Sequence, residues 1–156
     1  MILDATEADA SYIEDITVRA DAFGDEEVEA IGALWEEYLI LGAEHSGYSF
    51  LVDRDGSAIR GFVCYGPRDL TDGVYDVYYL VVDVDHRRQG TGRRLLTAGE
   101  REAQMTGARM MIAETSGRAD REPIRELCRS VGYEAEATIK DFYSEGEDLT
   151  VFVKRF

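Results

Sequence analysis

Residues 80–96 combine glycines and arginines in a pattern that suits phosphate binding. The run at 74–83 is rich in β-branched and aromatic residues and predicts a central strand, and a loop at 87–92 leads into a helix that extends to about Thr106. N–H groups at a helix N-terminus have no partner within the helix, and the helix dipole adds positive charge. The two glycines of the loop let a ligand approach the backbone closely. We therefore predict a pyrophosphate cradle formed by Arg87, Arg88, Gln89, Gly90, Thr91, Gly92 and Arg93.

The arginines of this segment support an anion-binding role. Four of the fifteen arginines lie at 87–94, in a chain that has 32 Asp and Glu against 17 Lys and Arg. The alternative is a solvated helix start with ordinary surface arginines. Two other phosphate motifs fit less well. A dinucleotide-binding fingerprint needs glycine where the chain has Leu95, and the Gly-Lys-Ser/Thr of a P-loop is absent.

Charge and composition narrow the class of protein. A net charge of −15 argues against general nucleic-acid binding, because the phosphate backbone would be repelled. The same charge leads to the hypothesis of a salt-adapted, halophilic protein, with an ordinary acidic cytosolic protein as the alternative. We expect no membrane span and no secretory signal, because the chain lacks the apolar runs that these require. Cys64 and Cys128 have no metal-ligand spacing and are too few for a disulfide framework, so a cytoplasmic location without a metal site is expected.

The pattern of apolar residues predicts one domain over residues 1–156. A strand at 2–5 precedes a helix with Ile13 and Ile16 inward, and Asp25 is placed to cap a second helix. A hairpin around 54–57, the central strand and the helix after the glycine loop follow, and then a strand at 110–115, a helix at 123–131 and a hairpin around 145–148. The order β-α-α-β-β-β-α-β-α-β-β predicts an α/β (α+β) fold. It has a mixed, mostly antiparallel sheet of about seven strands, with about four helices on its two faces.

The spacing Arg-x-x-Gly-x-Gly at 87–92 resembles the coenzyme A motif of the GCN5-related N-acetyltransferase (GNAT) superfamily. The predicted order of elements matches the superfamily fold, and residues 124–133 resemble its later segment, which usually reads Leu/Phe-Tyr-x-x-x-Gly-Phe. Residues 61–67, 75–78 and 139–143 look like a prokaryotic subgroup of unassigned substrate. The resemblance implies an acetyl-CoA-dependent N-acetyltransferase. Its acceptor would be a primary amine of a small molecule, an amino acid or a peptide N-terminus, and no metal would be required.

The resemblance also implies roles for the central strand. The backbone of Leu80, Val81 and Val82 would pair with the pantetheine arm, in a slot where this strand bulges and splays from its neighbour. An N–H near Val82 would stabilise the oxyanion as the amine attacks the thioester. The pyrophosphate would lie on the amides of residues 88–93.

Two carboxylates are candidates for a general base, because an attacking amine must be neutral and is mostly protonated at pH 7. Glu114 lies near the end of a short strand, and the resemblance matches it to a position that serves as base in some N-terminal alanine acetyltransferases. Asp76 is the second candidate, because strand alternation places it on the same face as Tyr78 and Val82. The alternative for either carboxylate is a structural pairing with an arginine or a helix end.

The proton donor to the leaving thiolate departs from the family pattern. Cys128 stands where the later motif usually has tyrosine, and it either donates the proton or packs as a small hydrophobic residue. Tyr143 could substitute if the final hairpin folds over the slot. Arg121 replaces an asparagine that is frequent in the family, and it could reach the cofactor's phosphate. The tyrosines at 48, 65 and 78 either line the acceptor site or pack in the sheet.

A second class of function, a non-catalytic acyl-CoA sensor, stays open because the tyrosine is missing. A third is a phosphate-binding protein that does not use coenzyme A. We expect an amine acceptor as the only partner class, with no nucleic acid or membrane, in a monomer or a homodimer.

Overall fold

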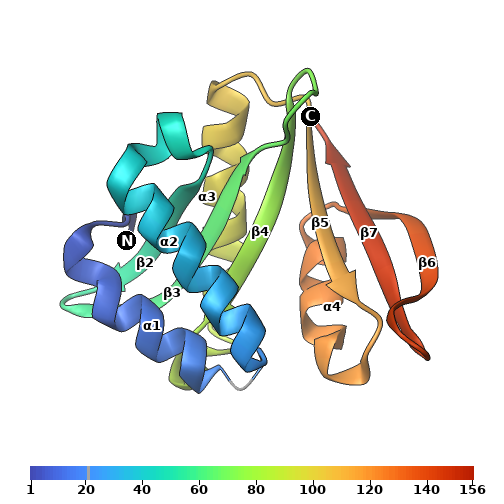
Figure 1. Ribbon diagram of the computed structural model, residues 1–156, viewed down its shortest axis with the longest axis horizontal. Helices are drawn as coiled ribbons and strands as arrows, with labels where there is room; N and C mark the ends of the chain where they lie inside the picture. Colours follow the sequence, from blue (N-terminus) through green and yellow to red (C-terminus); the bar gives the residue numbers. More distant parts are fainter. Residues whose placement is uncertain (21) are drawn as a thin grey trace.

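The computed structural model describes residues 1–20 and 22–156. Within these residues a seven-stranded sheet is flanked by four α-helices (Figure 1). The strands are β1 (Ile2–Asp4), β2 (Ser49–Asp55), β3 (Ala58–Pro67), β4 (Val74–Val82), β5 (Met110–Ser116), β6 (Glu134–Ser144) and β7 (Glu147–Arg155). The helices are α1 (Ala10–Arg19), α2 (Asp25–Ser46), α3 (Thr91–Met105) and α4 (Glu122–Ser130), with 3₁₀ turns η1 (Glu7–Asp9), η2 (Val84–His86) and η3 (Ala119–Arg121).

The strands lie in the order β1-β2-β3-β4-β5-β7-β6, which makes β4 the central strand. Only β4 and β5 run parallel, and every other neighbouring pair in the described sheet is antiparallel. The predicted order of elements and the predicted mixed, mostly antiparallel sheet are therefore confirmed.

Several boundaries differ from the prediction by one or a few residues. Asp25 is the first residue of α2 rather than its cap, because Gly24 is the N-cap and donates its N–H to the Glu27 carboxylate at 3.1 Å. Helix α3 begins at Thr91, before the second glycine of its loop. The last hairpin turns within two residues, because Gly146 adopts a left-handed φ of 82° that a tight turn requires.

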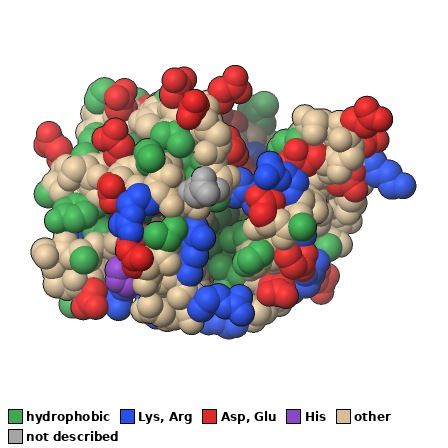
Figure 2. Space-filling view, turned by 90° about the horizontal axis from the view of Figure 1, so that it is seen from below, with side chains coloured by type: hydrophobic (Ala, Val, Ile, Leu, Met, Phe, Trp, Pro, Cys, Tyr) green, Lys and Arg blue, Asp and Glu red, His purple; other side chains and the backbone are tan. Residues whose placement is uncertain are grey.

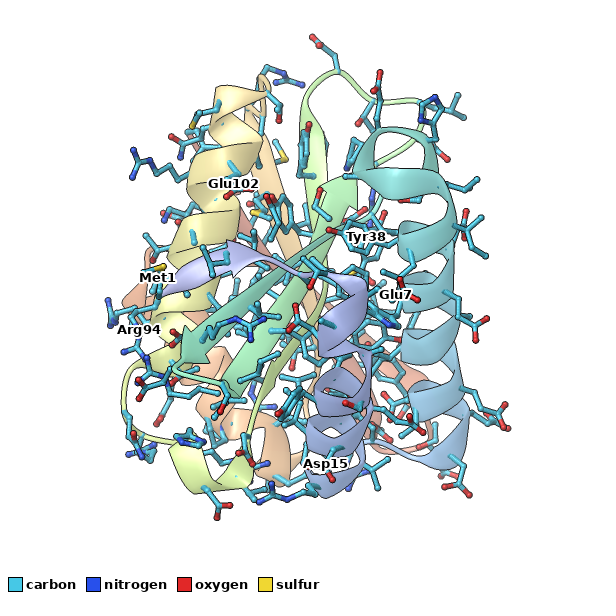
Figure 3. The ribbon with its side chains drawn as sticks, turned by 90° about the vertical axis from the view of Figure 1, so that its left-hand side faces the viewer. Met1, Glu7, Asp15, Tyr38, Arg94 and Glu102 are labelled. Carbon is cyan, nitrogen blue, oxygen red and sulfur yellow. The ribbon has the colours of Figure 1, made fainter. Side chains whose placement is uncertain are left out.

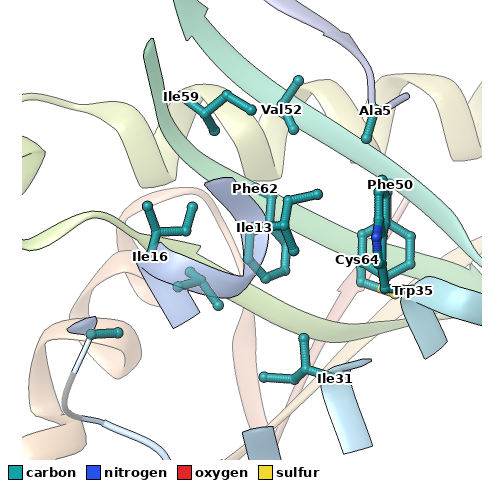
Figure 4. Packing of buried hydrophobic residues seen from close by; sticks show 12 residues of the cluster. Ala5, Ile13, Ile16, Ile31, Trp35, Phe50, Val52, Ile59, Phe62 and Cys64 are labelled. Atoms are coloured by element: carbon teal, nitrogen blue, oxygen red, sulfur yellow. The ribbon is translucent and has the colours of Figure 1, made fainter. Parts of the chain in front are cut away.

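Two hydrophobic cores cover the two faces of the sheet. Helices α1 and α2 contribute Ile13, Ile16, Ile31 and Trp35 to the first core, which packs on Phe50 and its neighbours (Figure 4). Helices α3 and α4 cover the opposite face with Leu95, Leu96 and Cys128. The inward positions predicted for Ile13 and Ile16 are confirmed, since each is 2% exposed.

Strand β4 has an irregular backbone in the middle of the sheet. Cys64 on β3 pairs with Tyr79, but Tyr65 pairs with Val77, so Tyr78 is an extra residue and forms a bulge. β4 also separates from β5, because the ladder between them contains only the four pairs from Val74–Met110 to Val77–Ala113. Figure 1 shows the two strands close at one end and apart at the other. The bulge and the splay that the resemblance implied are both present.

Candidate active site

The separation of β4 from β5 leaves backbone groups of β4 without partners. Asp83 N–H donates to the Arg60 carbonyl on β3 at 3.0 Å, and backbone groups alternate in direction along an antiparallel strand. Leu80 and Val82 therefore direct their N–H groups away from β3, toward a side where the described residues supply no acceptor. The same alternation turns the Val81 N–H toward β3. The predicted pairing of Val81 with a pantetheine arm does not fit this register.

The loop between η2 and α3 supplies a second set of unbonded donors. Arg88 and Gly90 have left-handed φ values of 62° and 79°, which turn the chain into the first turn of α3. The Arg94 N–H bonds to the Gly90 carbonyl at 3.0 Å. Within residues 1–20 and 22–156, no acceptor bonds to the N–H groups of residues 88–93. Unbonded donors at the start of a helix form a favourable site for a phosphate group.

The two glycines of the loop have different tasks. Gly90 needs its conformational freedom, because its left-handed φ disfavours a side chain. Gly92 lies in the first turn of α3, where a Cβ would come within 3.0 Å of the Leu127 side chain on α4. It would also come within 3.5 Å of Val82. Gly92 thus lets α3, α4 and β4 pack closely, and its role in giving a ligand access to the backbone stays a prediction.

Three of the four arginines in this segment, with Arg87 among them, have structural partners. Arg94 donates to the buried Asp53 carboxylate from Nε at 3.0 Å and from Nη2 at 2.6 Å. This contact links the start of α3 to β2. Figure 3 labels Arg94 beside α3. Arg93 donates to the carbonyl and hydroxyl of Ser130 at 3.3 and 2.9 Å. Among the described residues, Arg88 makes no side-chain hydrogen bond or ion pair, so its guanidinium is available to an anion.

Arg87 and Arg121 connect the two sides of the gap to the segment between α1 and α2. Arg87 donates to the Ala20 carbonyl at 2.7 Å, and Arg121 donates to the Ala22 carbonyl. The guanidinium of Arg121 also lies 5.3 Å from the centre of the Phe23 ring. Figure 2 shows this end of the molecule, where Lys and Arg side chains lie along a hollow with hydrophobic side chains inside it.

The two candidate bases lie together and share one arginine. Both carboxylate oxygens of Asp76 contact Arg68, at 2.8 Å from Nε and 2.7 Å from Nη2. Glu114 accepts from the same Nη2 at 3.4 Å. The Asp76 side chain is 12% exposed, whereas that of Glu114 is 45% exposed. Asp76 thus has the arginine partner that the structural alternative required, and Glu114 remains more accessible.

The bulge changes which residues of β4 share a face. Tyr78 and Tyr79 both pack against the core of α1 and α2, whereas Leu80 packs against the opposite core. Val82 therefore faces α3, and its predicted position on the same face as Asp76 and Tyr78 is wrong. Asp76 and Tyr78 do share a face of the sheet, because the residues on either side of Asp76 along β4 pack in the opposite core.

The three tyrosines considered for the acceptor site separate into two groups. Tyr48 and Tyr78 meet edge to face, with ring centres 5.3 Å apart, and burial raises the pKa of Tyr78 to about 12. Tyr65 lies on the opposite face and is 3% exposed. Its hydroxyl donates to Glu102 at 2.8 Å, which makes it a core residue.

The candidate proton donors differ in their surroundings. Cys128 is 2% exposed within the core of α3 and α4, and burial raises the pKa of its thiol to about 11. This environment fits the packing interpretation better than proton donation. Tyr143 is 47% exposed and stacks edge to face on Phe142. Partial burial, followed by the charges of Glu114 and other carboxylates, raises its pKa.

The structure brings Asp76 and Glu114 together through Arg68, at the point where β4 and β5 separate. Cys128 does not join this group, and Arg68 is the residue that the sequence analysis missed. Its partners come from two other strands, so no local spacing indicated it. Among the residues described, no group of three or more His, Cys, Asp or Glu side chains is arranged to hold a metal ion, and no helix is long and apolar enough to span a membrane.

Solved structures of other proteins share this architecture. A GNAT-family protein from Desulfovibrio desulfuricans superposes with a TM-score of 0.95 at 31% identity, and the match covers 99% of this chain and 98% of that one. A ribosomal-protein-alanine N-acetyltransferase from Brucella melitensis has a TM-score of 0.79 at 24% identity, covering 100% and 99%. A protein from Salmonella typhimurium, solved with its cofactor acetyl-CoA, has a TM-score of 0.77 at 22% identity, covering 99% and 92%.

No curated protein matches the chain. The sequence itself matches the acetyltransferase (GNAT) family over residues 9–133, which include the splayed strand, the cradle and both carboxylates. The sequence match and the likeness to the Desulfovibrio protein support the same assignment. The chain therefore belongs to the GNAT family of acetyltransferases.

Proposed function

We propose that the protein transfers the acetyl group of acetyl-CoA to a primary amine by direct attack within a ternary complex. The acceptor is a small molecule, an amino acid or a peptide N-terminus. The observation that carries this proposal is the presence of two sets of unbonded N–H groups, one at residues 88–93 and one at Val82 and Leu80. The first set forms the cradle, and the second faces the gap between β4 and β5. Asp76 and Glu114 lie in the part of the sheet where the two strands still pair or have just separated.

The residues present fit the cofactor. The amides of 88–93, the guanidinium of Arg88 and the α3 N-terminus supply donors and positive charge for a pyrophosphate. Leu80 and Val82 supply backbone groups to which an extended pantetheine arm can bond in place of a strand. In this proposal Arg121 exchanges its contact with the Ala22 carbonyl for one with a phosphate oxygen.

Glu114 acts as the general base in this proposal. The acceptor arrives as an ammonium, and Glu114 accepts one of its protons, directly or through a water, and passes it to solvent. The neutral nitrogen then forms a bond to the acetyl carbon while the carbon–sulfur bond breaks. The Val82 N–H donates to the thioester oxygen, on which negative charge develops. The nitrogen loses a second proton, and the leaving sulfur gains one.

Tyr143 is the more accessible of the two candidate donors for that sulfur. It is 47% exposed, whereas Cys128 is enclosed in the core. The Tyr143 hydroxyl and solvent water are therefore the proton sources to test first. The absence of tyrosine at position 128 also supports a second candidate function, a non-catalytic acyl-CoA sensor. Such a sensor would bind acetyl-CoA tightly without any thiol release that depends on an amine.

Two measurements test the proposal. Calorimetry in molar KCl should detect acetyl-CoA binding, and a screen of amines and peptides should find acceptors that release the CoA thiol. For an acceptor so found, Glu114→Gln should reduce kcat by about 100-fold or more, as expected for a general base. Glu134→Gln, which removes an exposed carboxylate from β6, is the matched control and should leave kcat unchanged. Tight binding without thiol release for any amine would instead support the sensor, and no binding at all would exclude both functions.

A further inference from the structure

Arg68 occupies a position between the two candidate bases. It follows Pro67, the last residue of β3, and its guanidinium reaches across β4 to β5. The carboxylates that it joins belong to neighbouring parallel strands, whose ladder ends one residue before Glu114. Arg68 thus lies at the point where the gap between the strands begins.

The contacts of the two carboxylates with Arg68 are unequal. Asp76 uses both oxygens in a bidentate pair at 2.7 and 2.8 Å, which is the geometry that fixes a guanidinium most firmly. Glu114 uses only Oε1, at 3.4 Å, and its Oε2 has no hydrogen-bond partner among the described residues. Asp76 therefore holds the arginine, and Glu114 keeps an oxygen for a substrate.

We propose that Arg68, fixed by Asp76, is a positioning residue that orients the Glu114 carboxylate toward the acceptor amine. In this arrangement Asp76 does not exchange protons with the substrate. The inference rests on the proposed function, because it assigns Glu114 the role of base. It resembles the general logic in which a base is oriented by a third group.

The charged groups joined to Glu114 come from two other parts of the sheet. Arg68 follows β3, and Asp76 lies on β4. Tyr143 on β6 makes no hydrogen bond to Glu114 among the described residues, and partial burial, followed by the charge of Glu114, raises its pKa. Arg68 is thus the cation in direct contact with Glu114, and Asp76 is the anion that shares it.

This arrangement predicts unequal effects of two substitutions in one ion pair. Arg68→Gln removes the group that contacts Glu114 Oε1, so the carboxylate loses its orientation and kcat should fall. Asp76→Asn keeps the guanidinium but weakens the bidentate pair that fixes it, so the loss should be smaller. The double variant should lose no more than Arg68→Gln alone, because Asp76 acts only through Arg68.

The experiment measures kcat and KM at pH 7 for an acceptor found in the screen. We expect the loss to fall on kcat and to be larger in Arg68→Gln than in Asp76→Asn, with KM little changed. At pH 7 we expect a loss of about tenfold in kcat/KM for Arg68→Gln, with partial recovery in Arg68→Lys, which keeps the charge but not the bidentate geometry. Acetyl-CoA affinity by calorimetry should stay unchanged in all four variants, which shows that they fold.

A second readout does not depend on turnover. The side-chain carboxyl carbon of Glu114, labelled with ¹³C and assigned with Glu114→Gln, reports its contact with Arg68 through its NMR chemical shift at a fixed pH. A chemical shift that moves in Arg68→Gln and returns in Arg68→Lys, without any turnover, would support the contact but contradict the proposed function. Turnover with additive losses in the double variant, or with an unmoved chemical shift in Arg68→Gln, would overturn the inference and leave the acetyltransferase proposal intact. Unchanged activity in Arg68→Gln would also overturn it.

Discussion

Replacement of Arg94 by methionine tests whether the arginines beside the cradle are partly structural. Asp53 is buried between β2 and α3 and accepts two hydrogen bonds from Arg94, at 3.0 and 2.6 Å. Burial alone would raise the pKa of the Asp53 carboxyl, but the hydrogen bonds from Arg94 and the Met1 amine and the charge of Arg60 lower it below its ordinary value. Arg94→Met removes the strongest of these partners and leaves the charge of Asp53 in the core.

The magnitude follows from these contacts. Breaking a fully buried ion pair costs about 3–5 kcal/mol, and a hydrogen bond to a charged group contributes about 1.5–3 kcal/mol. Arg94 is 42% exposed, and Arg60 remains 3.3 Å from Asp53, so we expect the lower end, about 2 kcal/mol at pH 7. For a chain of this length, that corresponds to a fall in Tm of about 4–8 °C.

The assay is urea unfolding at constant KCl, with Arg93→Met as the matched control. Both variants lose one positive charge, but Arg93 bonds only to the exposed Ser130, so its loss should cost about 0.5 kcal/mol or less. A lowered carboxyl pKa gives stability that is present above the unfolded pKa, about 3.9, and is lost as pH falls through the folded one. The difference between the original protein and Arg94→Met should therefore narrow below about pH 5. Equal costs for the two variants at pH 7, or a difference that does not change with pH, would refute this account of Asp53.

Three further outcomes are expected. Cys128→Ala should keep turnover and lose about 1–2 kcal/mol of unfolding free energy, because the thiol is packed in the core; a folded but inactive variant would restore its role as proton donor. Gly90→Ala should lose about 1–2 kcal/mol, because φ is 79° there, and calorimetry should show weaker acetyl-CoA binding; unchanged values would contradict the strained turn. Thermal unfolding should shift upward from low to molar KCl if the net charge of −15 is a halophilic adaptation, and a flat response would remove that hypothesis.

The fold could be predicted because its signals are local. The inward positions of Ile13 and Ile16 follow from helical spacing, and the strand, loop and helix of the cradle follow one another directly in the sequence. The backbone of the cradle was predictable for the same reason. Its amides are unbonded because of where the helix begins, which depends on a few consecutive residues.

The remaining features depend on pairing between distant segments. The run Val74–Val82 is apolar enough throughout that nothing in it marks Tyr78 as the bulged residue, so the face of Val82 was assigned wrongly. Arg68 meets Glu114 across 46 residues of sequence, and Arg94 meets Asp53 across 41. Such ion pairs form only once the sheet has placed the strands, and a count of arginines near the cradle cannot separate them from ligand-binding arginines.

The short ladder between β4 and β5 has a consequence for the protein's resistance to unfolding. The part of the sheet that ends at β4 and the part that begins at β5 pair with each other at one end only, through four residue pairs. A ligand arm bonded to Leu80 and Val82 would occupy the place of the missing ladder, and the free energy of its binding would add directly to that of the folded state. For an acetyl-CoA-dependent enzyme of this design, hydrogen exchange at these two amides should slow when the thioester is abundant. The lifetime of the protein against proteolysis should then follow the supply of its own co-substrate.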